Sequence, residues 1–254
     1  MVALLSVADL GTVLGVWAHP DDEVYLSGGL MAAARQAGQR VVVVSATMGE
    51  HGTATPDRWP PQRLARVRRL EAAASLAALG VSEHHWLGFA DGGCAAVPAP
   101  VGETAVARLI EQVRPDTIVT FGPDGVTGHP DHRTVSAWTT AAWRATGGSA
   151  RLLYATLTRR FHARWASLNE RVALWMSDER PVTDDDAVAM LLRCDEALLD
   201  RKLVALRAQA SQTAGLLAEV GEDAYRRWWA EEAFVDATAI AHRAARARRE
   251  PVSV

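Results

Sequence analysis

Short apolar runs alternate with helical segments over the first 157 residues, and no other feature of the chain restricts its fold as strongly. The expected strands are residues 12–18, 40–47, 84–87, 116–121 and 151–157, and the expected helices are residues 24–37, 60–79, 101–113 and 130–146. The second run contains VVVV, which is typical of a strand buried on both faces of a sheet. Strands that alternate with helices form right-handed βαβ units. The sequence therefore predicts an α/β fold with a mostly parallel sheet flanked by helices.

The remaining chain gives weaker signals. Residues 161–176 and 196–211 have helical patterns, and residues 187–194 suit either a strand or a helix. No linker, internal repeat or low-complexity segment separates this part from the rest. We therefore expect a single domain over residues 1–254, in which residues 1–157 form the parallel core and residues 158–254 an extension packed on the same sheet. The basic tail HRAARARREPVSV is interpreted as a solvated helix end.

Length, charge and cysteine content narrow the function classes. A chain of 254 residues can bury the core of one large α/β domain. Its formal net charge of −3 gives no indication of a nucleic-acid partner. Cys94 and Cys194 form no CxxC motif, and two thiols cannot build a disulfide framework. This usage of cysteine favours a reducing compartment.

Targeting signals are not found in the sequence. The first residues, MVALLSVADLG, have neither a basic n-region nor an A-x-A cleavage site, so we do not interpret them as a signal peptide. No apolar run approaches the ~18 residues that a membrane-spanning helix needs. We therefore expect a cytoplasmic protein without a membrane span, and the several helices leave a homo-oligomer open.

Polar segments follow each of the first four expected strands, and three of them contain glycine. They are HPDDE (19–23), MGEHG (48–52), LGFADGG (87–93) and GPDGVTGHPDH (122–132). In an open parallel sheet the loops that follow the strands gather at the carboxyl edge, where ligands bind. The sequence therefore predicts that these four segments build one site.

Two of these segments carry a metal-ligand pattern. His19 and Asp22 are three residues apart, so one turn can direct both side chains inward, and His132 can join them from the fourth segment. Three ligands of this kind and one open position are typical of catalytic zinc, although other divalent metals accept the same donors. Taken alone, His-Pro-Asp is also a good helix-start sequence. A structural zinc site is less favoured, because such sites are usually rich in cysteine.

The other polar residues of these segments suit an amide hydrolysis. Asp21 is expected to act as general base on a metal-activated water, and His129 to donate to an oxyanion or to protonate the leaving amine. Asp131 is expected to orient His129 and to keep it cationic. Glu23 is expected to support the ligands or the helix start, and Glu50 to approach the metal indirectly or to serve as a turn residue.

The paired histidine motifs resemble those of the LmbE-like, or PIG-L, family of de-N-acetylases. TMGEHG (47–52), RRLEAAASLAALGV (68–81) and DRKLVALRAQASQ (200–212) extend the resemblance over most of the chain. The resemblance implies a Rossmann-like α/β fold with one zinc ion. It also implies hydrolysis of the acetamide of an N-acetylglucosamine unit, which releases acetate and a free amine. A sub-branch of the family cleaves the amide of mycothiol conjugates.

The resemblance also assigns residues by position. It implies zinc ligands at His19, Asp22 and His132, a general base at Asp21, and a second catalytic histidine at His129 with Asp131 as its partner. Arg68 matches a family arginine near the substrate, or else forms a salt bridge on a helix surface. Asp91 is placed to bind sugar hydroxyls, or else forms a turn before Gly92. The chain departs from the mycothiol-pathway deacetylase at Thr127, where that enzyme has a tyrosine.

Three hypotheses follow from these residues. The first is a zinc-dependent hydrolase that removes the N-acetyl group from an N-acetylglucosamine-type glycoside. The second is an amidase for another N-acyl bond, such as that of a mycothiol-type conjugate. The third is a metal-bearing sugar-binding protein without turnover. In each case the partner is a small amino-sugar.

Overall fold

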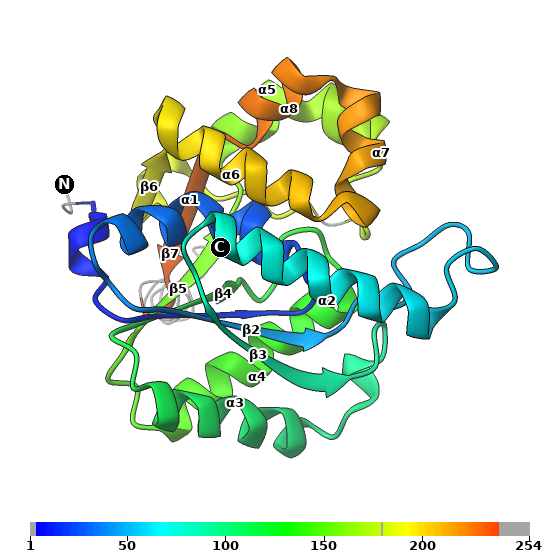
Figure 1. Cartoon of the computed structure of the whole chain (residues 1–254). Coiled ribbons are helices and arrows are strands. Elements are labelled where there is room, and N and C mark those ends of the chain that lie inside the picture. The colour runs from blue at the N-terminus through cyan, green and yellow to red at the C-terminus, as the bar shows by residue number, and fades with distance from the viewer. Residues whose placement is uncertain (1–3, 179, 239–254) are drawn as a thin grey trace, which may run out of the picture.

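One seven-stranded sheet organises the computed structural model, which describes residues 4–178 and 180–238 (Figure 1). The strand order is β3-β2-β1-β4-β5-β7-β6, and β3, β2, β1, β4 and β5 pair in parallel. The strands are β1 (Val13–Trp17), β2 (Val41–Thr47), β3 (Glu83–Phe89), β4 (Thr117–Phe121), β5 (Arg151–Thr156), β6 (Met190–Arg193) and β7 (Glu231–Asp236). The predicted α/β fold with a mostly parallel sheet is confirmed.

Helices cover both faces of the sheet (Figure 1). They are α1 (Asp22–Gln36), α2 (Pro61–Ala78), α3 (Ala99–Val113), α4 (Pro130–Ala145), α5 (Arg159–Arg171), α6 (Glu196–Ala208), α7 (Ala210–Val220) and α8 (Glu222–Trp228). Helices α3 and α4 lie below the sheet in this view, and α1, α2 and α6 lie above it. Every strand and helix predicted for the first 157 residues is present.

The sheet centre is apolar on both sides. Every residue of β1, β2 and β4 is buried, as expected for parallel strands with helices on both faces. The chain runs from β1 outward to β3 and then returns to place β4 on the other side of β1. Ligand sites of open α/β sheets lie at such a reversal of strand order, beyond the carboxyl ends of the strands. The loops after β1 and β4 flank this point.

The described part of the C-terminal extension adds two strands to the same sheet. Strand β7 pairs antiparallel with both β5 and β6. Residues 187–194, for which the sequence allowed either a strand or a helix, contain strand β6. Helices α7 and α8 and strand β7 were not predicted. The sequence of β7, EEAFVD, begins with two acidic residues and ends with a third, so its strand pattern is short and weak. The basic tail lies outside the described residues.

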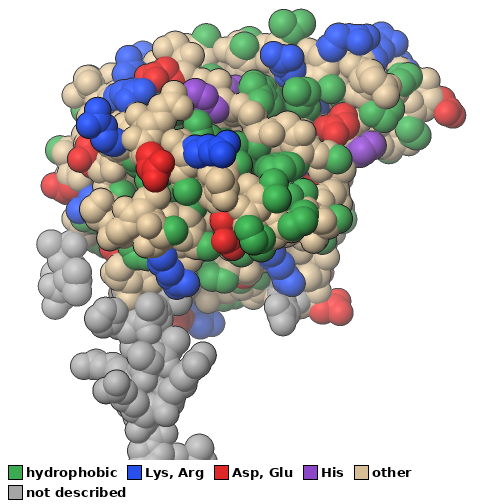
Figure 2. Space-filling view, turned by 90° about the horizontal axis from the view of Figure 1, so that it is seen from below, with side chains coloured by type: hydrophobic (Ala, Val, Ile, Leu, Met, Phe, Trp, Pro, Cys, Tyr) green, Lys and Arg blue, Asp and Glu red, His purple; other side chains and the backbone are tan. Residues whose placement is uncertain are grey.

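Figure 2 shows the face of the molecule on the side of α3 and α4. Basic, acidic and hydrophobic side chains are interspersed on the described residues of this face, which α3 and α4 cover. No helix among residues 4–178 and 180–238 is long and apolar enough to cross a membrane. Buried Cys94 and half-buried Cys194 are both free thiols.

Helix α1 is broken into two halves near its first turn. Ser27 has a φ of −148°, which is outside the helical range. The backbone N–H groups of Gly29 and Leu30 begin the second half and donate to Glu232 of β7 at 2.6 and 2.8 Å. A Cβ on Gly29 would come within 2.5 Å of the Cys194 sulfur, so only glycine fits at this approach. The kink thus depends on a carboxylate from the far end of the chain.

Lys202 of α6 completes this arrangement. Its Nζ donates to Glu232 Oε1 at 2.7 Å and to the carbonyl of Tyr25, in the first half of α1, at 2.9 Å. Both charged side chains are fully buried. The ion pair therefore links the two halves of α1 to the C-terminal extension.

Replacing Lys202 with methionine is expected to lower the free energy of unfolding by ~3 kcal/mol, because the Glu232 carboxylate would stay buried without its partner. Urea unfolding followed by circular dichroism measures the change. The control is Arg201→Met, at the neighbouring exposed position of the same helix. A Lys202→Met protein as stable as this control would show that the ion pair is not needed for stability.

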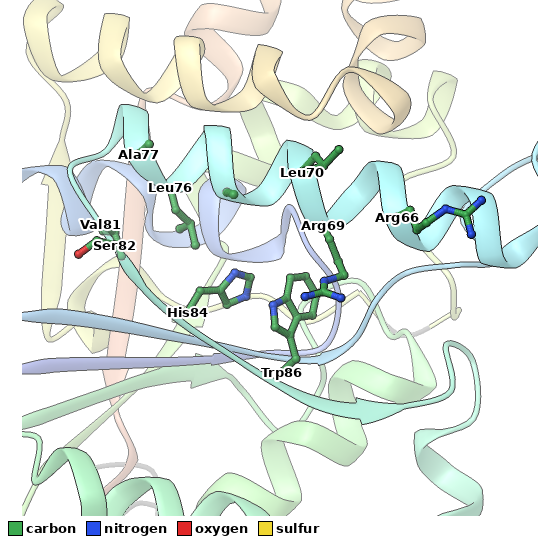
Figure 3. Close-up of a pocket in the computed structure, with 10 residues that line it drawn as sticks. Arg66, Arg69, Leu70, Leu76, Ala77, Val81, Ser82, His84 and Trp86 are labelled. Atoms are coloured by element: carbon green, nitrogen blue, oxygen red, sulfur yellow. The ribbon is translucent and has the colours of Figure 1, made fainter.

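A groove of about 610 Å³ lies between α2 and the edge strand β3 (Figure 3). His84 and Trp86 point from β3 towards α2, with their ring centroids 4.2 Å apart. His84 Nε2 lies 3.0 Å from the hydroxyl of Ser45. Burial, reinforced by the nearby charges of His85 and Arg69, lowers the pKa of His84 to about 4. His84 is therefore neutral in the folded protein near neutral pH.

Acidification is expected to destabilise the fold through His84. In the unfolded chain its pKa is about 6.5, so between pH ~6.5 and ~4 the unfolded state binds a proton that the folded state does not. Stability therefore falls as the pH drops through this window, by about 2 kcal/mol between neutral pH and pH ~5. His84→Gln should remove this loss in urea unfolding at the two pH values. His85→Gln, on the opposite face of β3, should keep it. Equal pH dependence in His84→Gln and wild type would contradict the assignment.

Candidate active site

The loops after β1 and β4 bring three donor side chains together at the reversal of strand order. His19 lies in the loop between β1 and α1, Asp22 begins α1, and His132 lies in the first turn of α4. His19 Nδ1 is 3.4 Å from Asp22 Oδ2 and 3.2 Å from His132 Nε2. His132 Nε2 is 3.2 Å from Asp22 Oδ1. The three side chains are buried and face one centre.

The spacing of these atoms fits a small divalent cation. Two ligands at 2.0–2.1 Å from a tetrahedral zinc ion lie roughly 3.3 Å apart, which matches the three separations. Among the described residues, two groups have all their donor atoms within 4.8 Å of one another, His19–His129–His132 and His19–Asp91–Asp131. Asp22 is in neither group, because it approaches His19 and His132 with different carboxylate oxygens. The second group lies around His19 Nε2, the ring nitrogen turned away from Asp22. His19 belongs to both groups, and Asp22 contacts His19 and His132.

Neighbouring groups fix both histidine rings in this orientation. His132 stacks on Phe121 at 4.1 Å, and its Nδ1 donates to the carbonyl of Gly125 at 3.0 Å, so Nε2 keeps its lone pair for the centre. His19 Nε2 lies 3.1 Å from Asp91 and 3.3 Å from Asp131. A carboxylate or carbonyl on the second ring nitrogen is the usual support of a metal-bound histidine.

Neighbouring charged groups shift the pKa values of His19 and Asp22. Burial alone would lower the pKa of His19, but hydrogen bonds with Asp131, Asp22 and Asp91 raise it well above its usual value. Burial alone would raise the pKa of Asp22, but the facing His132 and His19 rings lower it strongly. Buried carboxylates therefore surround the centre with charge that a cation would neutralise.

The structure corrects the role expected for Asp131. Its carboxylate accepts from the backbone N–H groups of Gly92, at 2.8 Å, and Cys94, at 3.0 Å, and faces the ring of His19. Only its backbone N–H contacts His129, where it donates to Nδ1 at 3.1 Å. Asp131 is therefore placed to orient His19, because the carboxylate is buried on the His19 side of the helix start.

His129 is a neutral imidazole in this structure. It is the N-cap of α4, and its Nδ1 accepts the Asp131 N–H, so the ring proton is on Nε2. Burial and the adjacent rings of His19 and His132 lower its pKa below the usual value. The expectation of a cationic His129 is therefore not met. The ring is half-exposed and lines the cavity described below.

Asp21 lies beside the three donors in an unusual backbone conformation. Its φ of 114° is rare for a residue with a side chain, and such strain is concentrated at functional sites. The backbone N–H of Asp21 donates to Glu23 at 3.0 Å, and its carboxylate accepts from Arg68 at 3.2 Å. Burial raises the pKa of Asp21 to about 6, although Arg68 opposes the shift. This value suits a general base.

Arg68 is buried rather than on a helix surface. Its guanidinium donates to Asp21 and to the carbonyls of Pro20 and Gly49, the latter at 2.8 Å. Gly49 has a φ of 62°, and a Cβ there would come within 2.0 Å of the guanidinium. Arg68 lines the cavity, but its terminal nitrogens already bind protein groups. Arg68 therefore holds the Asp21 side chain and the backbone before it in place.

Glu23 is held by Gln209, a residue that the sequence analysis did not identify. Glu23 is fully buried, and Gln209, between α6 and α7, donates to its Oε1 at 3.0 Å. Burial, followed by the charge of Asp21, raises the pKa of Glu23 to about 8. Gln209 lies seven residues after Lys202, two turns along the same helical face. The spacing of Lys202 and Gln209 in the sequence was the one indication that both side chains face the same way.

Asp91 and Glu50 form a chain of contacts that leads to His19. Glu50 accepts the backbone N–H of Asp91 at 3.0 Å, and the Asp91 carboxylate accepts the backbone N–H of His51 at 2.8 Å. Burial opposes ionisation of Asp91, but its contacts with His19 and the His51 N–H outweigh it and lower its pKa to about 2. Both carboxylate oxygens of Asp91 therefore have protein partners, and Asp91 also lines the cavity described below.

A cavity of about 530 Å³ opens above the three donors. Asp21, His129 and the donors line one side, and residues of the C-terminal extension line the other. Thr127 also lines it, with its hydroxyl 3.5 Å from His132 Nδ1. A cation site, an adjacent carboxylate base and a neutral N–H donor in one cavity are the groups that amide hydrolysis requires.

Comparisons with known proteins agree with this chemistry. The family model described as GlcNAc-PI de-N-acetylase, PIG-L, matches residues 14–143. A Saccharomonospora viridis protein named 1D-myo-inositol 2-acetamido-2-deoxy-alpha-D-glucopyranoside deacetylase is 34% identical over 79% of this chain and 84% of its own. The N,N'-diacetylchitobiose deacetylase of Pyrococcus horikoshii superposes with a TM-score of 0.63 at 20% identity, over 92% of this chain and 86% of that one.

The same fold also occurs with another chemistry. The 4-carboxy-2-hydroxymuconate hydratase GalB of Pseudomonas putida superposes with a TM-score of 0.61 at 17% identity, over 90% of this chain and 96% of that one. At such identities the likeness describes the fold alone. The reaction has to be argued from the site residues and from the family match.

Proposed function

Because the chain belongs to the PIG-L family of de-N-acetylases, we propose that it removes the N-acetyl group from an N-acetylglucosamine-type glycoside and releases acetate and a free amine. The observation that carries this proposal is the cluster of His19, Asp22 and His132 with Asp21 beside it in one cavity. A GlcNAc-inositol, the substrate in the names of its relatives, is the first substrate to try.

We propose one zinc ion held by His19, Asp22 and His132. The donor set supports this choice, because imidazole and carboxylate ligands with an open fourth position are typical of catalytic zinc. When bound, zinc supplies a Lewis acid that polarises the amide carbonyl and lowers the pKa of water. The support of His19 by Asp131 and Asp91 would keep Nδ1 directed at the ion.

Asp21 is proposed to take the proton of the attacking water. Its carboxylate is adjacent to the ligands, and Arg68 and the Glu23 contact hold it in place. The water oxygen then bonds to the acyl carbon, and the C–N bond breaks as the amine leaves. The proton held on Asp21 returns to the amine nitrogen, so the carboxylate is regenerated.

His129 is proposed to stabilise the oxyanion. Its Nε2 carries the ring proton and its side chain lines the cavity, so the N–H is available to the developing negative charge. Thr127 lies at the same wall, and its hydroxyl is the second donor there. This chain has no phenol at that position, which distinguishes it from the mycothiol-pathway deacetylase.

Primary-amine release from a panel of N-acetylglucosaminides, with and without a chelator, tests the proposal. Chelator-sensitive release of equal amounts of amine and acetate would support it. Release only from a mycothiol-type conjugate would favour the amidase alternative instead. Tight glycoside binding without release, in zinc-loaded protein, would favour a binding protein. We also propose a cytoplasmic setting, which the free thiols Cys94 and Cys194 support.

A further inference from the structure

The cavity above the proposed metal site has two unlike walls. The strand-end loops contribute charged and polar groups, whereas the extension contributes apolar side chains. The apolar wall consists of Leu174 and Met176 after α5, Leu216 of α7 and Trp228 of α8, with Tyr25 of α1 between the walls. Leu174, Met176, Leu216 and Trp228 are called the apolar wall below. Met176 is 62% exposed, which is high for a large hydrophobic side chain.

The segment that carries Leu174 and Met176 is held against the metal-site loop. The backbone N–H of Met176 donates to the carbonyl of Thr127 at 2.8 Å, and that of Leu174 donates to Asn169 at 2.9 Å. The intervening Trp175 stacks on His162 at 5.0 Å with nearly parallel rings. Leu174 and Met176 are therefore fixed at the cavity, next to the loop that carries His129.

Several polar groups that line the cavity already have protein partners. Arg68 binds Asp21 and two carbonyls, and Asp91 binds His19 and His51. Gln212, which also lines the cavity, donates to the carbonyl of Gly52 at 3.1 Å. A polyol placed against the apolar wall would lose its hydration without gaining partners, which is costly.

We propose that the apolar wall binds an apolar group carried by the amino-sugar, either an acyl chain longer than acetyl or a hydrophobic aglycone. This inference rests on the proposed function, because it assigns the second half of the same cavity. The two sources share one chemistry, the burial of methylene groups against Leu174, Met176 and Leu216. Trp228 also lines the cavity.

Two substrate pairs separate the sources. In the first, methyl and octyl glycosides both carry N-acetyl; in the second, N-acetyl and N-octanoyl groups are carried on the same methyl glycoside. We expect kcat/KM to be about tenfold or more higher for the longer member of one pair, because burial of two methylene groups already gives roughly this factor. The pair that shows the preference identifies the source.

Variants connect the preference to the wall. Met176→Ser and Leu216→Ala should each reduce the ratio of the two kcat/KM values by about threefold to tenfold. Leu70→Ser is the matched control, because Leu70 is 74% exposed on α2 and does not line this cavity. It should leave the ratio unchanged. Met176 is largely exposed, so its substitution should not prevent folding.

A binding measurement tests the apolar wall separately from the proposed de-N-acetylase function. Titration calorimetry of the octyl against the methyl glycoside should give a tighter Kd for the octyl compound, and Met176→Ser should reduce the difference. Equal kcat/KM values and equal affinities within both pairs would overturn the apolar wall while leaving the proposed function intact. Preferential octyl binding without amine release from any substrate would support the wall and overturn the proposed function.

Discussion

Replacing Asp21 with asparagine is expected to lower kcat about 10²- to 10⁴-fold while the protein keeps its metal. Asparagine has nearly the same shape, and it tolerates positive φ better than most residues, so the backbone at φ 114° should persist. The backbone N–H that binds Glu23 is also retained. What is lost is the carboxylate whose pKa of about 6 suits proton abstraction.

Single-turnover and steady-state amine release, together with metal content, measure this effect. Asp223→Asn, at an exposed acid in the first turn of α8, is the matched control and should behave as wild type. Loss of activity accompanied by loss of metal would mean that Asp21 acts through the ligands. Near-normal kcat in Asp21→Asn, with metal bound, would require another base.

Removing one of the proposed metal ligands is the second change from which we expect a large effect. His132→Ala should lose stoichiometric zinc and essentially all turnover, because the remaining histidine and carboxylate cannot complete a three-ligand site. Zinc at about a thousandfold excess over its Kd should stabilise the wild type by about 4 kcal/mol, and this gain should vanish in His132→Ala. Metal analysis and thermal unfolding with and without zinc measure both results.

A matched substitution distinguishes the alternative donor groups. His129 belongs to a group of three histidines, His19, His129 and His132, whose donor atoms lie within 4.8 Å of one another. Its ring centroid is 4.9 Å from that of His132. His129→Gln should keep zinc and its stabilising effect but turn over more slowly, since only an N–H donor to the oxyanion is changed. Loss of zinc in this variant would move His129 into the ligand set. Asp91→Asn makes the same comparison for the group His19–Asp91–Asp131.

The sequence predicted the parallel core and the convergence of the polar loops because both depend on local pattern. Runs such as VVVV can be buried only as inner strands, and parallel strands end at one edge. Once β1 and β4 are neighbours, His19, Asp22 and His132 have to approach one another. The arrangement of these donors therefore followed from strand order, which the chain encodes in its first half.

The sequence could not predict which partner each polar side chain takes. Asp131 was assigned to His129, two residues away, but its carboxylate binds His19, 112 residues away in sequence. Arg68 has the pattern of a helix-surface residue, yet the packing of α2 against the loop after β2 buries it. Gln209 meets Glu23 across 186 residues. Such pairings depend on how distant segments pack, and no local spacing records them.

The kink in α1 has a consequence for the order in which the protein matures. The proposed ligands lie between residues 19 and 132, whereas Glu232, which accepts the N–H groups at the kink, lies 203 residues after Gly29. Contacts of such long sequence separation form late in folding. A nascent chain therefore carries its metal donors long before the helix that presents Asp22 is fixed. We therefore expect α1 to reach its final form only after β7, which carries Glu232, has been synthesised.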